Sequence, residues 1–69
     1  MSTVKHDIQH DWTAVQGESV EIYKSGQLFR AGVVDTVTDD GEILWILGEG
    51  IMPRTMFERS EGYEVWAAD

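Results

Sequence analysis

The sequence predicts a small, mainly β domain in which five short strands form a barrel. Segments rich in Val, Ile, Trp and Tyr recur between residues 17 and 66, and several alternate apolar with polar residues. Glycine-containing turn sequences separate these segments at short intervals. The chain has 69 residues, which suits one domain near the lower size limit of a stable core. We therefore expect residues 17–69 to form the barrel and residues 1–16 to precede it as an arm.

The arm carries an apolar stripe that is typical of a short amphipathic helix. Val4, Ile8, Trp12 and Val15 are spaced as i, i+4, i+8 and i+11, which places them on one helical face. The remaining positions are mostly polar. We expect the arm to be either flexible or a short helix, and its apolar side is large enough to cover part of the barrel.

The first two strands are predicted from alternation and from a turn glycine. In "SVEIY" (19–23), Val20 and Ile22 share one face of the strand. Gly26 then permits a tight turn. The following segment, "LFRAGVVDTV" (28–37), is long and β-branched, but its alternation slips. A bulge or bend within residues 32–35 would restore the pattern, as glycine in a strand often does.

The third and fourth strands follow a strong turn signal. "DDG" (39–41) predicts a turn, and "EILWIL" (42–47) predicts a strand that is apolar on both faces. "GEG" ends this strand. Residues 51–53 are then expected to form a short strand that stops at the proline.

The last part of the chain predicts one helical turn and a closing strand. Thr55 and Glu58 have the spacing of a capping box, which favours a helical turn over "RTMFERSE". Gly62 would end the turn. "YEVW" (63–66) alternates again and is expected to be the fifth strand.

This succession resembles the SH3-like barrels, a group that includes Tudor and KOW modules. The resemblance covers about residues 15 to 66 and rests on "QGESVEIY", "GVVDTVTDDGEILWI" and "PRTMFERSEGYEVW". It implies a five-stranded barrel with one helical turn before the last strand. It implies no particular function, because this fold carries many unrelated ones.

The charge of the chain limits its partners. Thirteen acidic residues against five basic ones give a net charge of −8, and the basic residues are scattered. Direct nucleic-acid binding is therefore not expected, since it requires cations that meet phosphates. The acidity favours solubility or attraction to a basic partner. Candidate residues for such an acidic surface are Asp39, Asp40, Glu42 and Glu49.

The expected location is the cytoplasm, with no membrane partner. The sequence has no cysteine, and no apolar run of the length of a signal peptide or a membrane span. Disulfides and thiolate metal clusters are thus excluded within this sequence.

The two histidines raise the question of a metal site. On a helix, His6 and His10 would lie one turn apart, which is a spacing used for two metal ligands. Zinc sites generally need three or four protein ligands, so the polar side of the arm is the simpler interpretation. We expect no cofactor and no metal, and a histidine-based metal site remains an alternative. No serine lies in a nucleophile motif, and we expect no enzyme activity.

The most informative segment for function is the strand over residues 42–47. If Leu44 and Ile46 point into the barrel, then Ile43, Trp45 and Leu47 point outward, and the swapped assignment would leave the same apolar excess. Several large apolar side chains in a row on an outer face need a cover. The arm, a second copy or another protein would supply it. Trp66 and Trp12 would extend the same patch as aromatic anchors.

The main functional expectation is therefore a non-enzymatic protein-interaction module that binds another protein, or itself, around Trp45. One alternative is an acidic inhibitor that mimics nucleic acid on a basic groove. Another is an aromatic cage for a cation, for which the chain offers five rings together with Asp35, Asp39 or Asp40. The rings are Tyr23, Phe29, Trp45, Tyr63 and Trp66.

Overall fold

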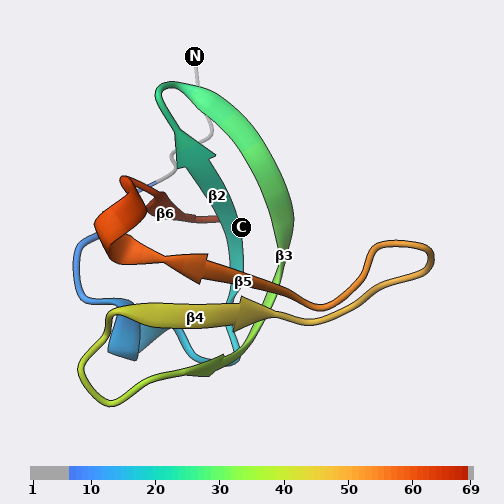
Figure 1. The fold of residues 1–69 in the computed structure, drawn as a ribbon, viewed down its shortest axis with the longest axis horizontal. Coiled ribbons are helices and arrows are strands. Elements are labelled where there is room, and N and C mark those ends of the chain that lie inside the picture. Colours follow the sequence, from blue (N-terminus) through green and yellow to red (C-terminus); the bar gives the residue numbers. More distant parts are fainter. Residues whose placement is uncertain (1–6, 69) are drawn as a thin grey trace.

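The computed structural model describes residues 7–68, which form six β-strands and two short 3₁₀ helices (Figure 1). The prediction of a mainly β domain is confirmed. In chain order the elements are β1 (Ile8–Gln9), η1 (Trp12–Val15), β2 (Ser19–Lys24), β3 (Gln27–Val37), β4 (Ile43–Ile46), β5 (Thr55–Glu58), η2 (Arg59–Glu61) and β6 (Glu64–Ala67).

All six strands belong to one antiparallel sheet with the order β1-β6-β2-β3-β4-β5. The described residues thus contain one strand more than the five expected. The sheet is open, because β1 and β5 are its two edges and do not pair with each other.

The long strand β3 joins the two halves of the sheet. Its first part pairs with β2, from Lys24 opposite Gln27 to Ser19 opposite Val33, and its second part pairs with β4. The register shifts between Val34 and Thr36, which confirms the irregularity expected over residues 32–35. As a result β3 curves, and β2 crosses the direction of β4 and β5 (Figure 1). Both halves then face one core.

Gly32 allows these two halves to approach closely. A Cβ atom at this position would lie 2.8 Å from Cγ2 of Ile46, which is shorter than real side-chain contacts. The glycine is therefore needed for packing between β3 and β4 and not for an unusual backbone angle.

The core lies between the two halves of the sheet and is closed by η1. Leu44 and Ile46 are fully buried, as their inward orientation predicts. Trp12 and Val15 of η1 are buried with them, at 2% and 3% exposure. The buried apolar residues are Trp12, Val15, Val20, Ile22, Val34, Leu44, Ile46, Phe57 and Val65.

The helix expected for the arm is wrong over residues 7–16. Ile8 instead pairs with Trp66 at the edge of the sheet, and η1 is a single 3₁₀ turn. The carboxylate of Asp11 begins this turn by accepting a hydrogen bond from the backbone N–H of Thr13 at 3.0 Å. An extended segment gains sheet hydrogen bonds with β6 that a helix would not make. Val4 and His6 lie outside the described residues.

The helical turn expected over residues 54–61 is only partly correct. Thr55–Glu58 is strand β5, and the 3₁₀ turn follows it at Arg59–Glu61. Pairing of β5 with β4 buries Phe57, and this gain outweighs the local capping preference. Gly62 ends the turn with a φ of 94°, as expected.

Residues 51–53 are not a strand. They belong instead to the protruding loop between β4 and β5, which is described below.

Candidate functional site

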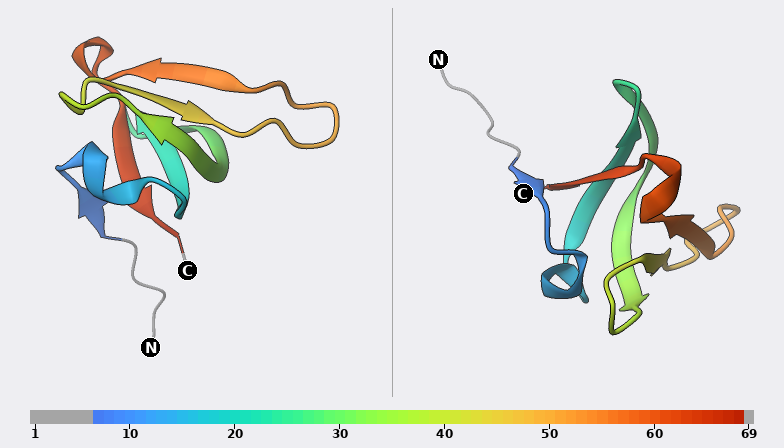
Figure 2. Two further views of the ribbon diagram at one scale, coloured as in Figure 1. Left: turned by 90° about the horizontal axis from the view of Figure 1, so that it is seen from below. Right: turned by 60° about the vertical axis from the view of Figure 1, so that its left-hand side comes forward.

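The loop between β4 and β5, residues 47–54, projects from the body of the protein (Figures 1 and 2). It is itself a narrow hairpin. Glu49 and Met52 exchange two backbone hydrogen bonds of 2.8 and 2.9 Å around a two-residue turn. Gly50 occupies the first turn position with a φ of 59°, a conformation that favours glycine at this place in hairpin turns. The loop therefore has a defined backbone.

Arg30 of β3 fixes the base of this loop. Its side chain is 7% exposed, and its guanidinium donates hydrogen bonds to three groups of the loop and of β5. These are the carbonyl oxygens of Leu47 (2.8 Å) and Pro53 (2.9 Å) and the hydroxyl of Thr55 (2.9 Å). Hydrogen bonds from a charged donor are stronger than neutral ones. Both strands of the loop are thus held to β3.

The loop and its neighbour β5 expose four large apolar side chains. Ile51 at the tip is 98% exposed, and Met52, Leu47 and Met56 are 46%, 43% and 41% exposed. We call these four residues the hairpin surface. Single exposed apolar residues are ordinary, whereas four on the loop and the adjacent strand form a candidate interaction surface.

The strand face around Trp45 is partly covered by the chain itself. Ile43 and Trp45 point outward, as predicted, but both are half-buried. The guanidinium of Arg54 lies 4.2 Å from the centre of the Trp45 ring, and its Nε lies 2.8 Å from a carboxylate oxygen of Asp35. Arg54 therefore covers part of the Trp45 ring, which the sequence did not predict. Leu47, the third residue of this face, stays exposed.

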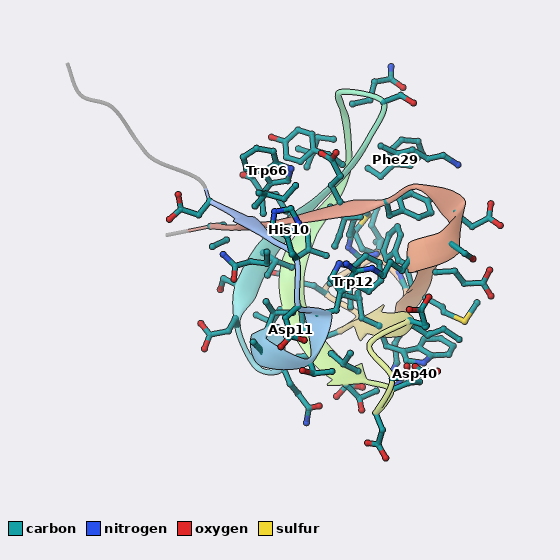
Figure 3. The ribbon with its side chains drawn as sticks, turned by 90° about the vertical axis from the view of Figure 1, so that its left-hand side faces the viewer. His10, Asp11, Trp12, Phe29, Asp40 and Trp66 are labelled. Atoms are coloured by element: carbon teal, nitrogen blue, oxygen red, sulfur yellow. The ribbon has the colours of Figure 1, made fainter. Side chains whose placement is uncertain are left out.

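The two other predicted anchors lie elsewhere. Trp12 is 2% exposed and belongs to the core, so it offers no surface to a partner in this structure. Trp66 is half-buried on β6, where its ring meets that of Tyr23 edge-on at 6.3 Å. In Figure 3, Trp12 lies in the middle of the molecule and Trp66 toward its edge. The structure thus distributes the predicted partner-binding residues over three places.

The predicted acidic residues fall into two groups. Asp39, Asp40 and Glu42 lie on the exposed turn between β3 and β4, whereas Glu49 lies on the projecting loop at the other end of β4. The carboxylate of Asp40 accepts hydrogen bonds from the Thr38 hydroxyl at 2.7 Å and from the Glu42 N–H at 3.0 Å. These bonds, that of Thr38 first, lower the pKa of Asp40.

The five rings considered for an aromatic cage do not converge on one point. Tyr63 meets Phe29 at 5.5 Å and Phe57 at 4.9 Å, and the Lys24 ammonium lies 4.9 Å from its centre. Trp45 lies under Arg54. Tyr23 and Trp66 form a separate pair on the other half of the sheet.

Metal ligands do not gather in the described part of the chain. His10 is exposed, and His6 precedes the first described residue. Over residues 7–68, no three side chains of His, Cys, Asp or Glu are close enough to share a metal ion. Within the same range, no helix is long and apolar enough to cross a membrane.

Sequence reasoning missed the residues that make the loop distinctive. Ile51 and Met52 are two large apolar residues between Gly50 and Pro53, and this glycine and proline are the signals that could have placed them in a loop. Arg30 gave no such signal. Its role depends on contacts with residues 17 to 25 positions later in the chain.

The chain matches no protein-family model, no curated protein and no solved structure.

Proposed function

We propose that this protein is a non-enzymatic interaction module with an SH3-like fold, which binds another protein through the hairpin surface. The observation that carries this proposal is the placement of Ile51, 98% exposed at the tip of a loop with a fixed base. An apolar side chain on a projection with a fixed backbone suits insertion into a pocket of a partner, because little backbone entropy is lost on binding.

The SH3-like part of the proposal is supported by the order of the strands. Without β1, the order is β6-β2-β3-β4-β5. The last strand, β6, therefore pairs with β2, and β2 to β5 lie side by side in chain order. The 3₁₀ turn η2 directly precedes that last strand, and one curved strand belongs to both halves of the sheet. The turn before the last strand is the feature that the resemblance implies, and the strand order and the curved strand are compatible with a barrel-like arrangement.

The hairpin surface is also continuous with the outward face of β4 around Trp45. Met56 is the register partner of Trp45 on the adjacent strand, and Leu47 directly follows β4. A partner seated on the loop would therefore reach Met56 and the edge of Trp45. Fully burying one exposed side chain of this size is worth about 1.5–3 kcal/mol. Ile51 would gain most of this, and Leu47, Met52 and Met56 about half of it each, against the entropic cost of association.

The test is capture of partners from a lysate of the source organism, treated with nuclease, on immobilised protein. Wild type is compared with a double variant, Ile51→Ser with Met52→Ser, and with Leu28→Ser as control. Leu28 is 52% exposed but lies at the start of β3, away from the loop, so the control removes a similar apolar side chain elsewhere. Trp45→Ala forms a fourth arm.

We expect a partner that wild type and Leu28→Ser retain at high salt and that the double variant loses. Since both replaced residues are exposed, the double variant should keep the circular dichroism spectrum of wild type. Equal capture by the double variant would refute the proposal. A sedimentation experiment on the protein alone shows whether the occupant is a second copy.

The acidic-mimic alternative is favoured by one observation. Each described basic side chain has a partner within the fold: Arg30 on the loop, Arg54 on Asp35 and Trp45, Arg59 on Trp12 and Lys24 on Tyr63. Asp39, Asp40 and Glu42 meanwhile extend from one turn. A partner lost at high salt from every variant, and lost when these three acids become amides, would support this alternative instead.

A further inference from the structure

A groove lies on the outer face of β2 and β6, on the other half of the sheet from the hairpin surface. Its volume is about 330 Å³, and its walls are Tyr23, Gly26, Glu64 and Trp66. Antiparallel pairing places Tyr23 opposite Glu64 and Glu21 opposite Trp66. Two aromatic rings therefore occupy one diagonal of a square on this face, and two carboxylates occupy the other.

The rings form two walls of the groove at a large angle to each other. Their centres are 6.3 Å apart, and their planes differ by 72°. Both side chains are half-buried, so each keeps an accessible part. The end of the groove at the turn around Gly26 is open, since no atom lies within 4 Å of a Cβ built on this glycine.

Each carboxylate is bonded to the polar edge of one ring. The Tyr23 hydroxyl donates to Glu21 at 2.9 Å, and the Trp66 indole N–H donates to Glu64 at 3.2 Å. The bond to Glu21 raises the pKa of Tyr23, which keeps the phenol neutral. Donation to an anion polarises each ring and makes its face more negative, which strengthens its attraction for a cation.

The other ring systems of the protein show what such a face binds. Cations of the chain lie 4.2 Å from the centre of Trp45, 4.9 Å from that of Tyr63 and 5.6 Å from that of Trp12. In the described part of the chain, no lysine or arginine lies over Tyr23 or Trp66. This pair is nevertheless the one with carboxylates at the ring edges.

We propose that the groove binds an alkylated ammonium group. Aromatic walls attract a weakly hydrated cation through its alkyl substituents and its charge together, and the Glu64 carboxylate neutralises it. The volume lies near the lower end of the range of small-molecule sites, about 300–1,000 Å³, which suits a compact head group. This inference does not depend on the hairpin surface.

The test is a titration of the protein with tetramethylammonium chloride at constant ionic strength. The readout is the nuclear magnetic resonance signal of the Trp66 indole N–H, identified by its loss in Trp66→Phe. Sodium chloride tests the effect of charge alone, and tert-butanol tests the effect of a neutral group of the same shape. We expect a saturable shift with tetramethylammonium only.

Two variants and their matched controls locate the site. Tyr23→Leu should weaken binding about fivefold, whereas Phe29→Leu on the adjacent strand should not. Glu64→Gln should weaken it about threefold, whereas Glu61→Gln removes the same charge from η2 without effect. If Tyr23→Leu does not fold, the comparison of Glu64→Gln with Glu61→Gln still shows whether the cation binds in the groove.

Three results would overturn the inference. They are a shift of equal size with tert-butanol or sodium chloride, the absence of any saturable shift of the Trp66 indole, and equal losses in the variants and their controls. Equal losses in Glu64→Gln and Glu61→Gln would mean that the net charge of −8 attracts the cation without a site.

Discussion

Asp40 shows how a single exposed carboxylate shapes this protein. It lies between Thr38 and Glu42 and accepts one hydrogen bond from each, so it closes the turn that joins β3 to β4. Asp11 does the same for η1 through Thr13, and both carboxyl groups have a lowered pKa because their charged forms accept these bonds. Part of the acidity of the chain therefore has a structural use.

This bonding predicts a pH dependence of stability. The folded pKa of Asp40 lies below the ordinary value of 3.8, so its stabilising contribution is complete above that value and disappears as the pH falls through the folded pKa. We expect Asp40→Ala to unfold at lower urea concentration than wild type near neutral pH. The difference should shrink as the pH is lowered below 3.8.

Asp39→Ala is the control, because it removes the same charge from the same turn but not the bonds to Thr38 and Glu42. Urea denaturation followed by circular dichroism at several pH values measures both variants. A constant difference between wild type and Asp40→Ala across the acidic range would contradict the assignment.

At the scale of elements, the β4–β5 loop depends on one buried arginine. Arg30→Leu would remove the guanidinium that donates to the oxygens of Leu47, Pro53 and Thr55, and of these the Pro53 oxygen would keep a second donor, the Thr55 hydroxyl. Hydrogen bonds to a charged group are worth about 1.5–3 kcal/mol each, and their losses are not additive, so we expect the free energy of unfolding to fall by about 2–4 kcal/mol.

Hydrogen exchange locates this effect. In Arg30→Leu, the amides of Leu47 and Met52, which bond to Val33 and Glu49, should exchange faster relative to those of β2. Arg59→Leu is the control, since its cation–π contact with Trp12 at 5.6 Å is worth about 1 kcal/mol or less. Unchanged exchange at the loop in Arg30→Leu would show that Arg30 does not hold it.

The strands that could be predicted from the sequence are those with local signals of their own. β2, β3, β4 and β6 fall where expected, because alternation marks β2 and β6, and β-branched or apolar runs between turn signals mark β3 and β4. β5 could not be predicted in this way. Its four residues fit both a capped turn and a strand, and only pairing with β4 decides between them.

The same limit applies to the candidate site. The outward direction of Trp45 was one of two assignments that the sequence allowed, and burial of Leu44 and Ile46 decides between them. The contact of Trp45 with Arg54 could not be predicted, because it depends on how residues 47–54 return the chain to β5. The groove between β2 and β6 corresponds to only a weak pattern in the sequence. Glu21 and Tyr23 on β2 and Glu64 and Trp66 on β6 share the pattern glutamate, aliphatic residue, aromatic residue. Their proximity required the sheet order.

At the scale of the whole molecule, η1 joins the beginning of the chain to the core. Trp12 packs with Leu44, Ile46 and other residues of the distant strands. Replacing a buried tryptophan by alanine costs about 3–5 kcal/mol. A domain of this size has a total stability of about 3–10 kcal/mol. We therefore expect Trp12→Ala to be largely unfolded or close to unfolding at room temperature.

Trp66→Ala is the comparison, because Trp66 is also near an end of the chain but only half-buried. Its loss of stability should be clearly smaller in urea denaturation followed by circular dichroism. Equal losses would mean that η1 contributes no more to stability than the outer face of β6 does.

The pairing of Ile8 with Trp66 has a consequence for engineering. The two residues are neighbours across β1 and β6, where paired Cα atoms are about 4.5–5.5 Å apart. The ends of a surface loop in a host protein lie comparably near each other, so residues 7–68 meet the geometric condition for insertion at such a position. The β4–β5 loop lies on the opposite side of the domain (Figure 2) and would then face away from the host, free for display.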